Sequence, residues 1–177
     1  MILGGSDTTS MTLSWILSLV LNNSEVLSKA KNELDQLVGD ERKVGDSDIL
    51  NLVYLRAIVK ESMRLFQGVP LSREVKEDCN IGGFSVKAGA RVLVNVWKVQ
   101  QDPSVWFAPS EFRLERFVTN NLGMDVRGQQ FELLPFGLVD GCVQGSRSRF
   151  KSFIWHLHVS FIASIWQFQR MLKPTGP

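Results

Sequence analysis

Glu61 and Arg64, two opposite charges three positions apart, are the first candidates for a functional role in this 177-residue chain. They lie in a segment with helical spacing, where residues three apart share a face and can form an ion pair. On a solvated surface such a pair contributes only about 0.2–0.5 kcal/mol and has no functional meaning. In the protein interior it needs a third group that satisfies its remaining hydrogen-bonding atoms. The sequence alone leaves both possibilities open.

A second candidate is the polar run Gly4–Ser10 (GGSDTTS), near the start of an expected helix over Met1–Leu21. Glycine weakens a helix, and Ser and Thr hydroxyls compete for its backbone carbonyls. These residues suit a helix that opens locally beside a ligand and offers hydroxyl and carboxyl groups for proton transfer. The alternative is an N-terminal cap, because Ser, Asp and Thr are good capping residues.

The third candidate is Cys142, within the stretch Phe131–Gly145 that also contains several glycines. A thiolate in such a loop can bind a metal, because glycine lets backbone N–H groups turn toward the sulfur. The alternative is a loop with an incidental free cysteine. Cys79 is the other cysteine of the chain, and two cysteines make no disulfide framework, so a reducing compartment is expected.

The distribution of charge divides the chain near residue 138. All 18 Asp and Glu residues lie at or before Asp140, whereas five of the 20 Lys and Arg residues and both histidines follow it. The length suits one domain with a core, and a hydrophobic content of 44% is ordinary for a globular protein. The chain has no Gly-rich phosphate loop and no zinc-like cysteine spacing. Its scattered basic residues give no support for nucleic-acid binding.

The elements that must position these candidates are mainly α-helical, with small β segments. The first helix is apolar on most sides after Met11, which predicts that it is buried. Its apolar run ends at Leu21 and is too short to span a bilayer. Helical spacing, strand-like alternation and turn residues together predict helices over Met1–Leu21, Glu25–Val38 and Asp46 to about Phe66, an extended segment Pro70–Arg73, and short strands Ile81–Val86 and Ala90–Asn95.

Five motifs in this order resemble the cytochrome P-450 family of heme-thiolate monooxygenases. They cover residues 1–137 and are Gly4–Thr9, Glu61-x-x-Arg64, the stretch from Asn95 through Asp102-Pro103 to Trp106, Glu115–Phe117, and Phe131–Gly137. The stretch Val126–Gly137 is similar to plant members that oxidise specialised metabolites. The resemblance implies the C-terminal part of the cytochrome P-450 fold, incomplete, with residues 1–137 as a partial heme-monooxygenase domain.

The resemblance also implies roles for the candidate residues. Asp7 and Thr8 are similar to the acid–Thr pair that delivers protons during dioxygen activation. Arg73 corresponds to a basic residue that contacts a heme propionate, and Cys142 is the only candidate for the heme-iron ligand.

The family resemblance gives the Glu61–Arg64 pair its third partner. Arg116, within Glu115-Arg116-Phe117, resembles the arginine that completes a buried Glu–Arg–Arg triad in this family. We therefore expect Glu61, Arg64 and Arg116 to be mutually close, buried and part of the heme-side scaffold.

Complete relatives insert oxygen into a small lipophilic substrate, using heme, dioxygen and electrons from a reductase. They reside at the endoplasmic reticulum membrane. No signal peptide or membrane anchor is expected in this chain, which predicts a cytoplasmic location if it is expressed.

Residues 138–177 are expected to be a divergent tail that is translated out of frame. Relatives continue approximately as Phe-Gly-Ser-Gly-Arg-Arg-Met-Cys-Pro-Gly, whereas Cys142 follows Phe136 by six positions instead of seven, and Val143 replaces the proline. Deleting one T after the Gly137 codon of a family-like gene reproduces the sequence from Gly137 to Lys151. Two alternatives stay open: a non-catalytic truncated remnant, and a helical interaction module that uses the aromatic residues of the tail.

Overall fold

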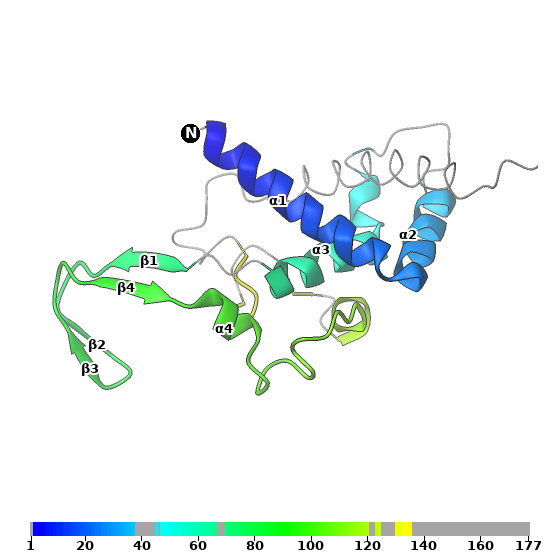
Figure 1. Cartoon of the computed structure of the whole chain (residues 1–177). Coiled ribbons are helices and arrows are strands. Elements are labelled where there is room, and N and C mark those ends of the chain that lie inside the picture. Colours follow the sequence, from blue (N-terminus) through cyan, green and yellow to red (C-terminus); the bar gives the residue numbers. More distant parts are fainter. Residues whose placement is uncertain are drawn as a thin grey trace, which may run out of the picture.

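The computed structural model describes residues 2–37, 45, 47–66, 70–120, 123–124 and 130–135, and of residues 2–9 and 120 it describes the backbone alone. This part of the chain is mainly helical with small antiparallel β segments, as the sequence predicts (Figure 1). In chain order the elements are α1 (Ile2–Leu21), α2 (Ser24–Leu37), the 3-10 turn η1 (Asp48–Leu50), α3 (Val53–Phe66), β1 (Leu71–Glu74), β2 (Cys79–Ile81), β3 (Phe84–Val86), β4 (Arg91–Val94), α4 (Val96–Gln100) and the π-helical turn η2 (Arg116–Asn120).

Helix α3 is the centre of the described fold. It contacts α1, α2, η1, α4 and η2, and every residue from Ala57 to Arg64 is buried. A helix buried on all sides needs partners for its polar residues as well as its apolar ones, which is why this helix can hold an internal ion pair. The apolar core around it consists of Ile16, Val20, Ala30, Leu34, Ile49, Leu52, Leu55, Ala57, Ile58, Val59, Met63, Trp106, Leu114, Phe117 and Leu133.

The N-terminus of α3 is capped by a side chain from another helix. The carboxylate of Glu33 in α2 accepts hydrogen bonds from the backbone N–H groups of Tyr54 (2.7 Å) and Leu55 (2.9 Å). These are the second and third residues of α3, whose N–H groups have no partner within the helix. The residue before the helix, Leu52, has no side-chain acceptor, so Glu33 takes over the role of an N-cap and fixes α2 against α3.

Helix α1 is less buried than its apolar sequence predicts. Ile16 and Val20 are fully buried in the core, but Met11 and Trp15 are 61% and 49% exposed. The expectation that this helix is buried is therefore wrong for Met11 and Trp15, whereas Ile16 and Val20 face the core beside α2 and α3. Trp15 is partly covered by Phe66, whose ring stacks on it with the centroids 4.8 Å apart.

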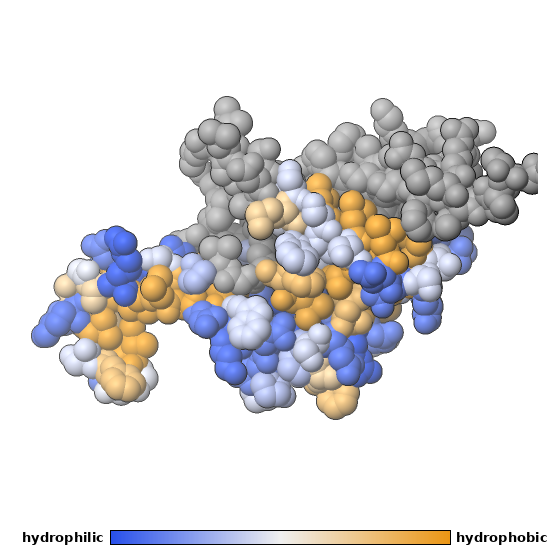
Figure 2. Space-filling view, viewed as in Figure 1, coloured by the Kyte–Doolittle hydropathy of each residue, from blue (hydrophilic) through white to orange (hydrophobic). Residues whose placement is uncertain are grey.

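The strands form an arm that extends from the helices (Figure 1). Strands β1 and β4 pair antiparallel, and β2 and β3 form a hairpin at the end of the arm. Gly82 and Gly83 connect the hairpin with φ of 58° and 88°, values that glycine adopts without steric cost. Figure 2 shows hydrophobic surface along this arm, where Phe84 and Leu93 are 78% and 66% exposed.

After α4, the chain returns to the core through an aromatic anchor. Asn95 caps α4 by accepting the N–H of Lys98 at 3.0 Å, and Asp102 closes the next turn by accepting the N–H and O–H of Ser104. Trp106, at the end of this turn, is only 2% exposed. Among the helices of the described residues, none is both long and apolar enough to cross a membrane.

Candidate functional site

Glu61 and Arg64 form an ion pair in the interior of the protein. Arg64 Nε donates to Glu61 Oε2 at 2.8 Å, and Arg64 Nη2 donates to Glu61 Oε1 at 2.9 Å. Both side chains have no exposed surface. Two parallel N–H to oxygen bonds fix the guanidinium plane against the carboxylate, so the pair has one geometry and not several. Of the two possibilities that the sequence left open, surface or interior, the structure shows the interior ion pair.

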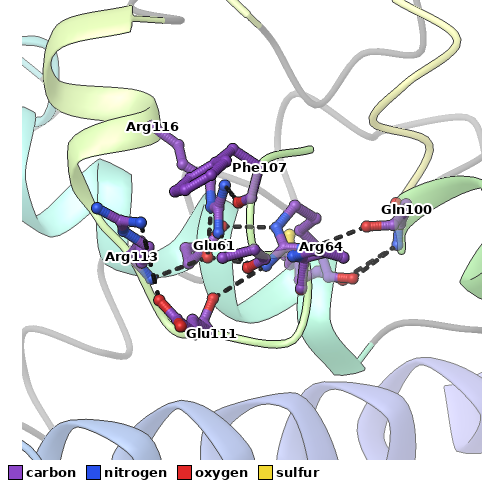
Figure 3. Close-up of polar contacts among 10 residues, drawn as sticks. Glu61, Arg64, Gln100, Phe107, Glu111, Arg113 and Arg116 are labelled. Atoms are coloured by element: carbon purple, nitrogen blue, oxygen red, sulfur yellow. Dashed lines mark hydrogen bonds and ion pairs between the residues drawn. The ribbon is translucent and has the colours of Figure 1, made fainter. Parts of the chain in front are cut away.

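Arg116, at the start of η2, joins this pair. Its Nε donates to Glu61 Oε1 at 3.2 Å, and its side chain is 8% exposed. The backbone N–H of Arg113 donates to the same oxygen at 3.0 Å. The structure thus brings together the three side chains that the sequence analysis grouped, and Figure 3 shows both arginines directed at the Glu61 carboxylate.

A turn of three consecutive backbone carbonyls accepts the outward-facing nitrogens of the two arginines. Arg116 donates from Nη1 to Phe107 O and from Nη2 to Ala108 O, the latter at 2.6 Å. Arg64 Nη1 donates to Pro109 O at 2.8 Å. Ala108 has φ of 46°, in the left-handed region that costs a residue with a side chain roughly 1–2 kcal/mol. The network holds this turn in place and offsets that cost.

Every N–H group of Arg64 has an acceptor. Besides Glu61 and Pro109, its guanidinium donates to the backbone carbonyls of Gln100 at 2.9 Å and Glu111 at 3.3 Å. The same group lies 5.3 Å from the centre of the Trp106 ring, within the range of a cation–π interaction. A buried arginine with five satisfied donors is a fixed reference point for the segments that supply its acceptors.

The charges of this network do not balance by ion pairing alone. Glu61 carries one negative charge, whereas Arg64 and Arg116 carry two positive charges. The excess positive charge faces the negative ends of carbonyl dipoles, which replace the water that both guanidinium groups lose on burial. The carbonyls belong to Gln100, Phe107, Ala108, Pro109 and Glu111. This arrangement holds segments together; no group in it is placed to act as an acid or a base.

Of the other predicted site residues, only Arg73 has a described side chain, and within the described residues no bond joins it to this network. Asp7 and Thr8 lie within α1, and their side chains are outside the described residues. The alternative that the Gly4–Ser10 run caps the helix is wrong, because α1 begins at Ile2 and the run lies inside it. Arg73 is exposed in β1, where it pairs with Val92 of β4. Cys142 lies outside the described residues.

Three residues that position the site were not identified from the sequence. Gln100 binds the C-terminal end of α3, Glu33 caps its N-terminal end, and Ala108 turns the carbonyls toward the arginines. These hydrogen bonds of Gln100 and Glu33 join segments far apart in the sequence, so a spacing rule could not find them. The sequence carries no signal for the positive φ of Ala108, because a following proline favours an extended conformation at the residue before it.

Comparison with known proteins identifies the class. The family description for cytochrome P-450 matches residues 1–138, so the chain belongs to the cytochrome P-450 family. Its fold is also similar to a solved structure of a zebrafish cytochrome P-450 with abiraterone. The TM-score is 0.76 and the identity 30%, over 87% of this chain and 36% of that chain.

Plant enzymes are among the similar proteins. The chain is 62% identical over 138 residues to a protopine 6-monooxygenase of Eschscholzia californica, covering 77% of this chain and 26% of that protein. It is 56% identical over 140 residues to a xanthotoxin 5-hydroxylase of Arabidopsis thaliana, covering 77% and 27%. A cytochrome P-450 of Trigonella foenum-graecum matches over 171 residues at 46% identity, covering 96% and 32%. The chain therefore spans about a quarter to a third of the length of these relatives.

Proposed function

We propose that residues 1–137 are part of the heme-side region of a monooxygenase that oxidises a small lipophilic plant metabolite. The observation that carries the proposal is the buried network of Glu61, Arg64 and Arg116 in a chain of this family. In this proposal the network is structural. It locks α3, α4, η2 and the carbonyl turn into the one arrangement that the cofactor region requires.

The described residues fit heme at one of its two attachment points. Arg73 is exposed in β1, and its guanidinium has no side-chain partner within the described part of the chain, so it is free to bind a propionate carboxylate. The only thiol in that part is Cys79, on the hairpin strand β2. The family resemblance makes Cys142 the candidate for the iron ligand. Bound heme would supply iron that activates dioxygen with electrons from a reductase.

The remaining roles follow from the same proposal. Asp7 and Thr8 would hold and pass on the protons that dioxygen activation consumes. The substrate would be a small lipophilic compound of the kind that the relatives' names give, such as protopine or xanthotoxin. The complete protein would work at the endoplasmic reticulum membrane with a reductase as its partner.

A second candidate is a non-catalytic remnant whose residues 138–177 are translated out of frame. Two observations favour it: the family match ends at residue 138, and the acidic residues end at Asp140. In this case Cys142 is a by-product of the shifted frame and binds no iron. The match to the Trigonella relative, however, continues over 171 residues and so extends into residues 138–177. Sequencing of the parent transcript is the direct test of the reading frame.

Heme titration of the purified chain separates the two candidates. If the first holds, heme is taken up stoichiometrically, and the ferrous–carbonyl complex shows the absorbance typical of a thiolate ligand. Cys142→Ser should abolish this absorbance, whereas the matched control Cys79→Ser should retain it. Absent uptake, or spectra that Cys142→Ser leaves unchanged, would favour the remnant.

A further inference from the structure

Gln100, the last residue of α4, connects three segments through one side chain. It has no exposed surface. Its Nε2 donates to Arg64 O at 3.2 Å and to Met63 O at 3.4 Å, and its Oε1 accepts the backbone N–H of Leu134 at 3.1 Å. Figure 3 shows the Gln100 side chain next to Arg64, with dashed lines joining the two residues.

The two carbonyls that Gln100 binds are among those that a helix cannot satisfy itself. Helix α3 ends at Phe66, so the carbonyls of its last four residues, including Met63 and Arg64, have no N–H partner within the helix. Both of these residues are buried, so partners for their carbonyls must come from the protein and not from water. Arg64 returns a bond from its guanidinium to the backbone carbonyl of Gln100 at 2.9 Å. The contact between α3 and α4 is therefore reciprocal.

The third bond of Gln100 reaches the segment 130–135. Leu133 and Leu134 are buried, and Pro135 has no N–H to donate. The N–H of Leu134 is thus the donor nearest the end of this segment that can anchor it to the helices. Only an amide side chain can donate to two carbonyls and accept an N–H at the same time, which accounts for glutamine at this position.

We propose that Gln100 is a positioning residue that sets where the segment 130–135 lies relative to the C-terminal turn of α3. Because Arg64 belongs both to this contact and to the ion-pair network, the segment is placed in register with Glu61 and Arg116. The statement that this segment leads into a heme-binding loop rests on the proposed function. The position of the segment relative to α3 does not depend on that proposal.

Hydrogen exchange of the Leu134 amide in the full chain tests the placement without heme. In Gln100→Met the exchange of Leu134 should become roughly 2- to 12-fold faster relative to α3 amides such as that of Ile58, the factor that corresponds to one net hydrogen bond. Gln101→Met is the matched control, since the Gln101 side chain has no hydrogen bond within the described part of the chain, and it should leave the ratio unchanged.

A second variant covers the case in which Gln100→Met does not fold. Gln100→Asn keeps the amide but shortens its reach by one methylene, so it should accelerate Leu134 selectively without placing an apolar side chain against the α3 carbonyls. The proposal is overturned if Leu134 exchanges freely in the unmodified protein, or if its exchange changes only in step with Ile58. Heme uptake is measured separately, so a failure of the proposed function leaves this outcome intact.

Discussion

Removal of the Glu61 carboxylate should strongly destabilise the fold. The carboxylate accepts four hydrogen bonds, two from Arg64, one from Arg116 and one from the N–H of Arg113. In Glu61→Ala, both guanidinium groups remain buried as like charges without a counter-ion. Stripping one partner from a buried ion pair costs about 3–5 kcal/mol, a large part of the roughly 5–15 kcal/mol that stabilises a typical domain. The free energy of unfolding, from denaturant titration followed by far-UV circular dichroism, measures the loss.

Two controls make this prediction specific. Glu61→Gln keeps the shape and one oxygen acceptor but removes the charge, so its loss should lie between zero and that of Glu61→Ala. Glu77→Ala removes an exposed carboxylate and should change the free energy of unfolding by no more than about 0.5 kcal/mol. A loss below about 1 kcal/mol for Glu61→Ala would refute the reasoning, because a buried charge left unpaired cannot cost so little.

Three further predictions concern the cap of α3, the backbone at Ala108 and the turn at Asp102. Glu33→Gln should lower the free energy of unfolding by about 1 kcal/mol, the typical value of an N-cap, whereas Asp35→Asn on the exposed face of α2 should not. Ala108→Gly should be neutral or slightly stabilising, whereas Ala108→Val should destabilise the fold by more than about 1 kcal/mol, because valine adds strain at φ of 46°. Equal effects of the two variants in thermal unfolding would contradict this. The hydrogen bonds from Ser104 hold the pKa of Asp102 below its usual value. The ionised carboxylate therefore stabilises the fold above about pH 4, and this stabilisation is lost as the pH falls through the lowered pKa. Asp102→Asn should remove this part of the acid dependence in a pH series of unfolding curves.

The parts of the fold that depend on local patterns could be predicted from the sequence. Helical spacing predicted α1 and α2 closely, but α3 begins at Val53 and not at Asp46, because the separate turn η1 precedes it. The expected single strand Ile81–Val86 is wrong, because Gly82 and Gly83 form the turn of the hairpin between β2 and β3. The spacing of Glu61 and Arg64 predicted a shared face, but it could not decide between surface and interior. That decision needed Arg116, which lies 55 residues away from Glu61 and is connected to it only by tertiary structure.

Several features that the sequence did not predict depend on partners distant in the chain. Glu33 caps α3 across 21 and 22 residues, and Gln100 meets Leu134 across 34 residues. No propensity or spacing rule records such contacts. The exposure of Trp15 was mispredicted for a related reason. Apolar periodicity says that a helix face can be buried, whereas actual burial depends on which neighbours cover it.

The polar network has a consequence that an apolar core would not share. Replacing a buried ion pair with well-packed apolar residues is often neutral or stabilising, so stability alone does not explain Glu61 and Arg64 here. Arg64, however, binds acceptors on α3, α4 and the turn after Trp106 at once, each with a directional bond. Sliding any of these segments by one residue would leave a buried donor unpaired, at about 1–3 kcal/mol for each lost bond. An apolar contact tolerates such a slip, because dispersion is not directional. Together with the bonds of Gln100 and Arg116, the network therefore specifies one arrangement of these segments. In the proposed function, this selectivity keeps a cofactor region built from several loops in place.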